Sequence, residues 1–507
     1  MSFRLFACTT SRDSYSTFFR NISGRFSRIG LLLGLLLMSS ALLDSSASAC
    51  TTAVISGKAT RDGRPLLWKN RDAPNVRNEV VFLEDGKYKV LAVVNAGARQ
   101  SIWMGMNSAG LCIENSVTND LAFPKESKGL GNGSFMLKVL RECATVRDVE
   151  QLLVETDKMG RSTAANFGVI DAAGGAVLFE SARGSFRKFD ANDPLVAPLG
   201  YVARSNFSIT GKKLADHPAA DELGSIYSAN RYLRANALLA ERIKSGTAKK
   251  ADGLDVRYLL RHVARDLAEA DGAPCTGSVN GTVGDLPPFI ETKNTISRTT
   301  TVSFVVFQGV QQGENPLLTT MWTGLGDPKF TIAVPCWVGM KQVSEDLRGE
   351  KEGGAVGVAA RKLRNVYYRE RSLTEAGSSA TAATSPAGNE ESEREETAGN
   401  NSGSGQVATA VSGIETTGLQ EVWKDIWAQE DEVITRVEKQ LAVWRKKGVD
   451  PSSQLAIHLS SAEQGVAALK SAVKEAEGLF PPAQPTPAST TSTPADTKPA
   501  LSGAANQ

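Results

Sequence analysis

A cysteine lies directly behind a run of small residues near the start of the chain. Cys50 follows Ala47, Ser48 and Ala49 in the stretch SASACTT, and cleavage after Ala49 would make it the first residue. A free α-amine would then lie next to its own thiol. Because an α-amine has a reference pKa of about 7.7 to 8.0 and a thiol one of about 8.5, the amine can take the thiol proton during attack on a carbonyl. The pattern predicts a nucleophile and a base on one residue, with no histidine required.

The residues before Cys50 are typical of a secretory signal peptide. An apolar run of 15 residues, IGLLLGLLLMSSALL, precedes the small residues before Cys50. Five arginines come before this run: Arg4, Arg12, Arg20, Arg25 and Arg28. The run is shorter than the roughly 20 residues that span a bilayer, and no later stretch is longer or as apolar. We therefore expect an exported chain, periplasmic or extracellular, without stable membrane insertion after signal cleavage.

The sequence leaves other roles for Cys50 open. It could be half of a disulfide, or the acylated anchor of a lipoprotein, which would consume both reactive groups. Five of the six cysteines follow the signal (Cys50, Cys112, Cys143, Cys275 and Cys336). In an oxidising compartment this odd number predicts two disulfides and one free thiol, for which Cys50 is the best candidate. A set of reduced cysteines without a disulfide framework is the alternative.

The segment after Cys50 predicts a β-hairpin. In CTTAVISGKATRDGRPLLWKNRDAP, Asp62 and Gly63 mark the reversal, and the second strand returns beside the first to end at Asp72. The carboxylate of Asp72 would then lie near the start of the mature chain. There it can hold the ammonium group or orient the thiol.

These residues resemble the cysteine branch of the N-terminal nucleophile hydrolases. That branch includes choloylglycine hydrolases, penicillin V acylases, acyl-coenzyme A:6-aminopenicillanate acyltransferases and cysteine dipeptidases. The resemblance covers roughly residues 50 to 340 and implies Cys50 as nucleophile and Asp72 as the site carboxylate. The stretches MGMNSAGLCIENS, GYVARSNFSIT and NTISRTTTVSFVVFQG carry the matches to the three other site positions (Asn115, Asn206 and Arg298).

The resemblance implies a role for each of these three residues. Asn115 would bind the oxyanion together with a backbone N–H, donors worth about 2.7 to 4 kcal/mol each when preorganised. Asn206 and Arg298, with Asp72, would position the start of the chain. Arg298 would keep the thiolate's surroundings positive, although a surface ion pair is its alternative. The chain has Lys69 where bile-salt hydrolases have arginine, which weakens that specificity. The roles of Lys69, Arg71 and Asn166 stay open, and for Asn166 a structural role that caps or bridges strands is the alternative.

Strand and helix patterns predict an α+β fold. Ten short β runs with turn residues between them lie between residue 50 and about 341, and helical patterns begin at Ser134, Ser228 and Val256. The resemblance implies a four-layer αββα sandwich. The expected parts of the chain are a signal peptide at 1–49, a catalytic domain at 50–345, a disordered low-complexity linker at 346–415, a helical hairpin at 416–480 and a disordered Pro/Thr-rich tail at 481–507.

Composition narrows the function. The 507 residues carry a formal charge of +2 and no basic stripe, which excludes a nucleic-acid partner. No phosphate loop or metal-spaced cluster occurs, so we expect no cofactor and no metal. The sequence predicts an exported amidase that hydrolyses, or transfers the acyl group of, a small linear amide through a thioester. A cysteine dipeptidase and a lipid-anchored, non-catalytic surface protein are the alternatives, and a homo-oligomer stays open.

Overall fold

The computed structural model describes residues 49–121, 129–213, 228–245, 253–270, 272, 286–372 and 410–480. Residues 1–48 of the predicted signal peptide (1–49), most of the predicted linker (373–409) and the tail at 481–507 lie outside this range. So does Cys275. No helix of the described residues is both long and apolar enough to cross a bilayer.

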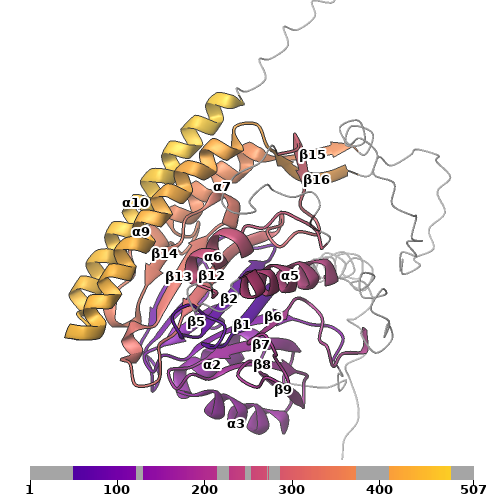
Figure 1. Cartoon of the computed structure of the whole chain (residues 1–507), viewed down its shortest axis with the longest axis vertical. Helices are drawn as coiled ribbons and strands as arrows, with labels where there is room; N and C mark the ends of the chain where they lie inside the picture. Colours follow the sequence, from indigo (N-terminus) through magenta and orange to yellow (C-terminus); the bar gives the residue numbers. More distant parts are fainter. Residues whose placement is uncertain are drawn as a thin grey trace, which may run out of the picture. The chain divides into compact units, whose positions relative to one another are not determined.

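Two large antiparallel sheets form the centre of the fold (Figure 1). The first has the strand order β10-β1-β2-β12-β13-β14: β1 (Thr51–Ile55), β2 (Leu66–Asp72), β10 (Tyr201–Arg204), β12 (Thr301–Gln308), β13 (Thr320–Leu325) and β14 (Val334–Cys336). The second runs in chain order: β3 (Asn78–Leu83), β4 (Val90–Asn95), β5 (Met104–Asn107), β6 (Cys112–Val117), β7 (Ala165–Ile170), β8 (Ala176–Ser181) and β9 (Phe186–Asp190).

The predicted hairpin after Cys50 is confirmed as β1 and β2. Thr51 pairs with Asn70 and Ile55 with Leu66, and Gly63 at the reversal has a φ of +76°, a conformation that glycine adopts without strain. Strand β10 flanks β1 and strand β12 flanks β2. The residue that begins β1 is therefore fixed by hydrogen-bonded ladders on both sides.

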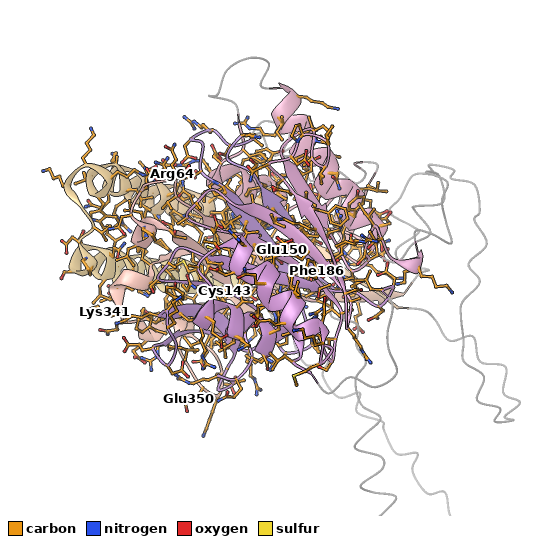
Figure 2. The ribbon with its side chains drawn as sticks, turned by 90° about the horizontal axis from the view of Figure 1, so that it is seen from below. Arg64, Cys143, Glu150, Phe186, Lys341 and Glu350 are labelled. Atoms are coloured by element: carbon orange, nitrogen blue, oxygen red, sulfur yellow. The ribbon has the colours of Figure 1, made fainter. Side chains whose placement is uncertain are left out.

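The facing sides of the two sheets share one apolar core, in which Val54 and Leu67 lie with Cys112 and Leu178. Helices cover the outer faces. On the seven-stranded sheet these are α2 (Asn132–Glu142) and α3 (Val146–Asp157), which Figure 2 shows from below, and the rings of Phe135 and Phe167 are 5.0 Å apart. On the six-stranded sheet they are α5 (Ala229–Ser245), α6 (Val256–Tyr258) and the π-helical turn at Leu259–Val263. The predicted αββα sandwich is confirmed.

The helical pattern from Ser134 forms two helices. Helix α2 ends at Glu142, and Thr145 starts α3 with a capping box in which its side chain accepts from the Asp148 amide. A threonine followed three residues later by an acidic residue satisfies the free N–H groups at a helix start. This local signal explains why the chain turns here although the apolar periodicity continues.

The predicted C-terminal hairpin is α9 (Leu419–Lys447) and α10 (Pro451–Leu479), the yellow pair in Figure 1. Trp444 of α9 packs on Trp337 with ring centroids 5.5 Å apart, in the apolar cluster that covers the six-stranded sheet. Arg265 and Glu430 form a buried ion pair at 2.7 Å that ties α9 to the turn after α6. The hairpin thus belongs to the helical layer of the sandwich.

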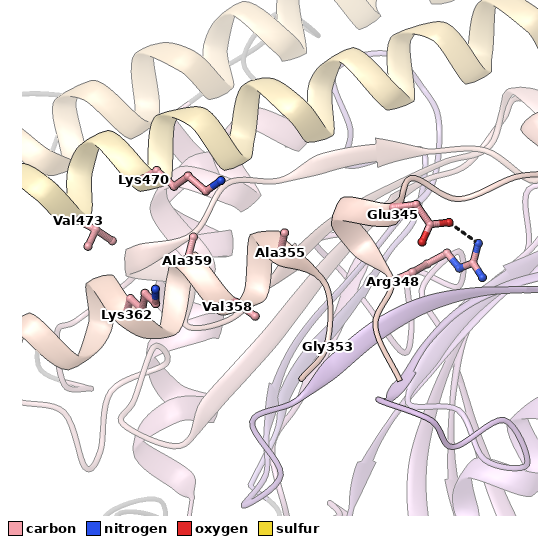
Figure 3. A pocket seen from close by; sticks show the side chains of 9 residues that line it. All are labelled: Glu345, Arg348, Gly353, Ala355, Val358, Ala359, Lys362, Lys470 and Val473. Atoms are coloured by element: carbon pink, nitrogen blue, oxygen red, sulfur yellow. Dashed lines mark hydrogen bonds and ion pairs between the residues drawn. The ribbon is translucent and has the colours of Figure 1, made fainter. Parts of the chain in front are cut away.

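Helix α10 also packs against α7 (Ala355–Tyr367), which lies in the range 346–415 that composition assigned to a linker. This range also holds β15 (Tyr368–Ser372) and β16 (Ala410–Glu415), which form a small sheet with β11 (Phe289–Glu291). A groove of about 450 Å³ lies between α7 and α10, with Lys362 and Lys470 among its lining residues (Figure 3). Its lining residues lie outside the cluster around Cys50.

Candidate active site

Cys50 precedes the central strand β1 and is 3% exposed. Its nitrogen donates to the side-chain oxygen of Asn206 at 2.6 Å. The chain in the structure is uncut, so this atom is the peptide nitrogen of the Ala49–Cys50 bond and stands in for the α-amine that cleavage would release. Two of the predicted site residues are therefore in direct contact, although 156 residues separate them in sequence.

Arg231 completes this contact and was missed in the sequence. One of its terminal nitrogens, Nη1, donates at 2.7 Å to both the carbonyl oxygen of Cys50 and the hydroxyl of Thr51, and the other, Nη2, donates at 2.9 Å to Asn206 Oδ1. The side chain is 1% exposed and comes from the first turn of α5. A positive side chain in the first turn of a helix is unfavourable because the helix dipole is positive at that end. This unusual position is the one sequence signal that Arg231 makes a tertiary contact.

Asp72 ends β2, one strand away from Cys50, and is fully buried. It accepts from the Thr301 hydroxyl at 2.6 Å and lies 3.9 Å from the guanidinium of Arg298. Burial raises the pKa of Asp72 to about 6, while the charges of Arg231 and Arg298 oppose this rise. Arg298 therefore contacts the carboxylate, and no described contact joins it to the thiol.

Asn115 approaches the site through Lys69. The Lys69 ammonium donates to Asn115 Oδ1 at 2.7 Å and to the carbonyl of Trp103 at 2.8 Å. Because Oδ1 accepts from Lys69, the amide nitrogen of Asn115 is left as a donor without a partner among the described residues. Burial lowers the pKa of Lys69, and the charges of Cys50 and Glu114 oppose that effect. Lys69 thus links Asn115 electrostatically to the nucleophile.

Arg71 lies two residues further along β2, on the same face as Lys69. Its guanidinium donates to Asn78 Oδ1 at 2.7 Å and to Asn95 Oδ1 at 3.0 Å, and its central carbon lies 4.4 Å from the centre of the Trp103 ring. Burial lowers the pKa of Arg71 to about 10, with Cys50 the strongest opposing charge. Both cations that the sequence left open therefore lie close enough to Cys50 to interact with it electrostatically.

Glu114, next to Asn115, is a second residue that sequence reasoning missed. It is fully buried, and neither carboxyl oxygen reaches a donor at hydrogen-bonding geometry, although Thr52 and Gly168 lie nearby. Burial raises the pKa of Glu114 to about 7, and the charge of Lys69 opposes this rise. Glu114 thus places an ionisable side chain at a fully buried position of strand β6.

Asn166, the third residue whose role the sequence left open, joins β7 to the segment after β10 by donating to the Phe207 carbonyl at 3.0 Å and accepting from the Ser208 hydroxyl at 2.9 Å. The two described histidines also make structural contacts. His458 accepts from the Ser344 amide at 2.9 Å, and burial lowers its pKa to about 4. His262 stacks on Tyr258. Within the described ranges, no group of three His, Cys, Asp or Glu residues could hold a metal ion.

The expectation of two disulfides is wrong. The four cysteines in the described part of the chain are all free, buried thiols: Cys50, Cys112, Cys143 and Cys336. The last three lie in apolar clusters of the core, where they act as small apolar side chains. Among the cysteines from Cys50 onward, only Cys275 lies outside the described residues, so the alternative of unpaired cysteines describes the molecule.

No protein-family model and no curated protein matches the sequence. Among solved structures, the chain is similar to a variant of conjugated bile acid hydrolase from Clostridium perfringens (15% identity, 54% of this chain and 89% of that one, TM-score 0.34). It is also similar to penicillin V acylase from Agrobacterium tumefaciens (16% identity, 60% of this chain and 89% of that one, TM-score 0.34). A third similar structure is the N-acylethanolamine-hydrolyzing acid amidase ortholog of Caenorhabditis elegans (14% identity, 53% of this chain and 93% of that one, TM-score 0.31).

Proposed function

We propose that this chain is an exported amide hydrolase whose nucleophile is the thiol of Cys50 at the start of the mature protein. The observation that carries the proposal is the contact of the Cys50 nitrogen with Asn206 Oδ1 at 2.6 Å, braced by Arg231. A structural cysteine needs no such fixation of its backbone nitrogen by a buried amide and a guanidinium. A nitrogen that serves as a base does, because proton transfer requires a fixed geometry.

The reaction begins when the α-amine takes the thiol proton and the sulfur attacks the carbonyl carbon of a linear amide. The negative charge that develops on the carbonyl oxygen is stabilised by the side-chain N–H of Asn115 and a backbone N–H. The C–N bond then breaks, the leaving amine takes the proton back from the ammonium group, and a thioester remains. Water, activated by the same amine, releases the acid and restores the thiol; an amine in place of water would give acyl transfer.

The surrounding charges suit this cycle. The guanidinium of Arg231 donates to the carbonyl of Cys50 at the start of β1, and Asp72, at the end of the neighbouring strand β2, is paired with Arg298. Lys69 and Arg71 add positive charge near the sulfur. The lipid-anchor alternative is disfavoured because a diacylglyceryl group on a sulfur of a 3% exposed residue would have to displace packed side chains. A dipeptidase uses the same chemistry and differs only in its substrate.

The proposal is tested on protein that begins at Cys50, produced by removing a cleavable N-terminal tag. Intact mass would verify the first residue, and hydrolysis would be measured on N-acyl amino acids, penicillin V, acyl homoserine lactones and dipeptides. We expect turnover that Cys50→Ala abolishes, and no turnover by a chain that begins at Ala49, because its Cys50 nitrogen is an amide and cannot act as a base. Cys143→Ala, which removes another buried thiol, is the matched control and should keep activity. Hydrolysis that survives Cys50→Ala would refute the mechanism.

A further inference from the structure

A buried ion pair adjoins the segment that contacts Asp72. Lys329 and Asp327 are 0% and 1% exposed, and the ammonium nitrogen of Lys329 lies 2.7 Å from the carboxylate. The same nitrogen donates to the carbonyl oxygen of Ser297 at 2.9 Å and to its hydroxyl at 3.0 Å. An ammonium group has three N–H donors, so all of them are used. Burying two charges is costly even when they are paired, so the place of this pair calls for an explanation.

Ser297 directly precedes the residues that contact Asp72. Its amide donates to the carbonyl of Asp266 at 3.0 Å, so hydrogen bonds fix its main chain at both the N–H and the C=O. The next residue, Arg298, lies 3.9 Å from Asp72, and its amide donates to the Thr301 hydroxyl at 3.0 Å. This hydroxyl in turn donates to Asp72 at 2.6 Å. A displacement of Ser297 would therefore disturb both contacts of the carboxylate.

Lys329 also acts on Asp72 through space. Burial raises the pKa of Asp72 to about 6, and the charge of Lys329 is among those that oppose this rise. Other charges that act on Asp72 come from α5, from its own strand and from the segment after Ser297 (Arg231, Lys69, Arg71 and Arg298). Burial lowers the pKa of Lys329, and the charge of Asp327 is the strongest opposing effect. Lys329 is thus linked to Asp72 both by a chain of contacts and by charge.

The stretch behind residue 345 holds this pair from outside. Tyr368, the first residue of β15, donates its hydroxyl to Asp327 at 3.2 Å. Arg364 of α7 lies 4.0 Å from Asp327 and donates to the carbonyl of Thr299 at 2.9 Å. Its central carbon lies 4.2 Å from the centre of the Tyr368 ring. Both residues lie in the range that composition assigned to a linker, and they contact the pair and the segment that it holds.

Helix α9 reaches the same place through Arg265. The pair flanks the first residue of the 3₁₀ turn at Pro328–Phe330, and the Nε of Arg265 donates to the Pro328 carbonyl at 2.8 Å. The other four N–H groups of Arg265 bond to the carboxylate of Glu430 and to two more backbone carbonyls. All five donors of this guanidinium are therefore used. The turn that carries Lys329 is thus fixed to α9.

We infer that Lys329 and Asp327 position the segment that holds Asp72 in the proposed active site. By fixing Ser297, the pair sets the place of the side chains that contact this carboxylate. The inference rests on the proposed function and deepens it. Helices α7 and α9 and strand β15, which lie after the predicted catalytic domain, are then needed for the reaction, although their described contacts do not include Cys50.

The first test is Lys329→Met in protein that begins at Cys50, measured on the amide that the unchanged enzyme hydrolyses fastest. We expect kcat to fall about ten- to a hundredfold, because a misplacement of about 1 Å at a distance from the reaction can cost about a hundredfold in rate. KM should stay close to that of the unchanged enzyme, because in the proposed reaction the pair acts on groups around the nucleophile. Without the Lys329 charge, the pKa of Asp72 should rise, and the acidic limb of the pH–kcat profile should move to higher pH. A residue that only stabilises the fold would leave this limb in place.

Two milder variants have matched controls in the same stretch. Tyr368→Phe removes the hydroxyl that reaches Asp327, whereas Tyr367→Phe removes a buried hydroxyl without a hydrogen-bond partner among the described residues. Arg364→Gln loses a bond to the segment before β12, whereas Arg361→Gln loses bonds of the same helix to backbone carbonyls at the surface. We expect Tyr368→Phe and Arg364→Gln to lower kcat about three- to tenfold, since each loses a hydrogen bond to the pair or its segment. The two controls should leave kcat unchanged.

The outcomes separate this inference from the proposed function. If Cys50→Ala abolishes hydrolysis but folded Lys329→Met keeps full kcat and an unmoved acidic limb, the inference is overturned and the proposed function stands. If Lys329→Met does not fold, equal kcat in each milder variant and its control overturns the inference instead. Circular dichroism of each variant establishes whether it is folded.

If no amide is hydrolysed, the proposed function fails, and carbon-13 NMR of the Asp72 carboxyl group then decides on the pair. The signal is identified by its loss in Asp72→Asn. Its titration midpoint should rise in Lys329→Met, which removes a charge, and in Arg364→Gln, which displaces the Thr301 hydroxyl. It should stay in place in Arg361→Gln. A midpoint that moves in neither of the first two variants would overturn the inference.

Discussion

Asn206 offers the sharpest test of the proposed mechanism. Its side chain accepts from the Cys50 nitrogen at 2.6 Å and from Arg231 at 2.9 Å, and it donates to the Val117 carbonyl at 2.7 Å. Asn206→Ala removes all three contacts and takes an acceptor from two buried donors, one of them charged. The base of the proposed reaction would then be free to move away from the thiol.

The expected loss follows from these contacts. General-base catalysis by a positioned group contributes about 10² to 10⁴ in rate, and Asn206 positions the base without being one. We therefore expect kcat/KM to fall about a thousandfold, or about 4 kcal/mol of transition-state stabilisation. Most of the loss should appear in kcat, because in the proposed reaction this side chain positions the base. The free energy of unfolding should fall as well, by about 1 to 3 kcal/mol for each buried donor that loses its acceptor.

Asn107→Ala is the matched control, because Asn107 is another buried asparagine with a full set of contacts. Its nitrogen donates to the carbonyls of Leu140 and Cys143 at 2.8 Å, and its oxygen accepts from the amides of Ala109 and Leu111 at 3.1 Å. This variant should lose comparable stability in urea denaturation while its kcat/KM stays near that of the unchanged enzyme. If Asn206→Ala keeps more than a tenth of kcat/KM, or if Asn107→Ala loses as much activity, Asn206 does not position the base.

Three further predictions concern charge. Burial raises the pKa of Glu114 to about 7, so the folded state binds this proton more tightly than the unfolded state does. The resulting contribution to the free energy of unfolding is complete below about pH 4 and declines as the pH rises to about 7. In urea denaturation at several pH values, Glu114→Gln should remove this decline, which is on the order of 2 to 3 kcal/mol. If Asp72 acts as a carboxylate, activity should fall below about pH 6. The hydrogen bond from Thr301 lowers the pKa of Asp72, so Thr301→Val should raise this pKa and shift the acidic limb of the pH–kcat profile to higher pH. An unmoved limb would exclude Asp72 as its source. Glu430→Ala should lower the free energy of unfolding by about 3 to 5 kcal/mol, because it leaves buried Arg265 unpaired. Glu432→Ala, at an exposed position of the same helix, is the control. If Glu430→Ala costs no more stability than this control, the buried pair is not needed.

Local signals in the sequence predicted much of the fold. Asp62 and Gly63 identified the β1–β2 reversal because a tight turn needs residues that tolerate positive φ. The period of the apolar residues identified α9 and α10, and Gly448 separates them with a φ of +96°. Helix α7 was missed because GGAVGVAARKLRNVY precedes a long polar stretch, and its glycines and short apolar residues resemble a linker until α10 packs on them.

The site was predicted less completely, for a different reason. The resemblance named Cys50 and Asn206 as site residues, and in the structure the Cys50 nitrogen and the Asn206 side chain lie at hydrogen-bonding distance. Arg231 escaped detection because two of its partners lie 180 and 181 residues away along the chain, and its one local signal, an arginine in the first turn of a helix, does not identify them. Glu114 escaped detection because the alternation of residues along a strand predicts only the face on which a side chain lies. The raised pKa of Glu114 arises from its burial between the two sheets, which the sequence pattern does not report.

The covering of the six-stranded sheet by α9 has a consequence for how the molecule is made. Trp68 of β2 and Val437 of α9 belong to one apolar cluster, yet ribosomes synthesise them far apart in time. At 5 to 20 residues per second, the strand waits roughly 20 to 70 seconds for the helix that covers it. During this interval a broad apolar sheet face would be exposed to self-association. A nascent chain of this design would need a holding chaperone, or would have to stay unfolded until its last helix is complete.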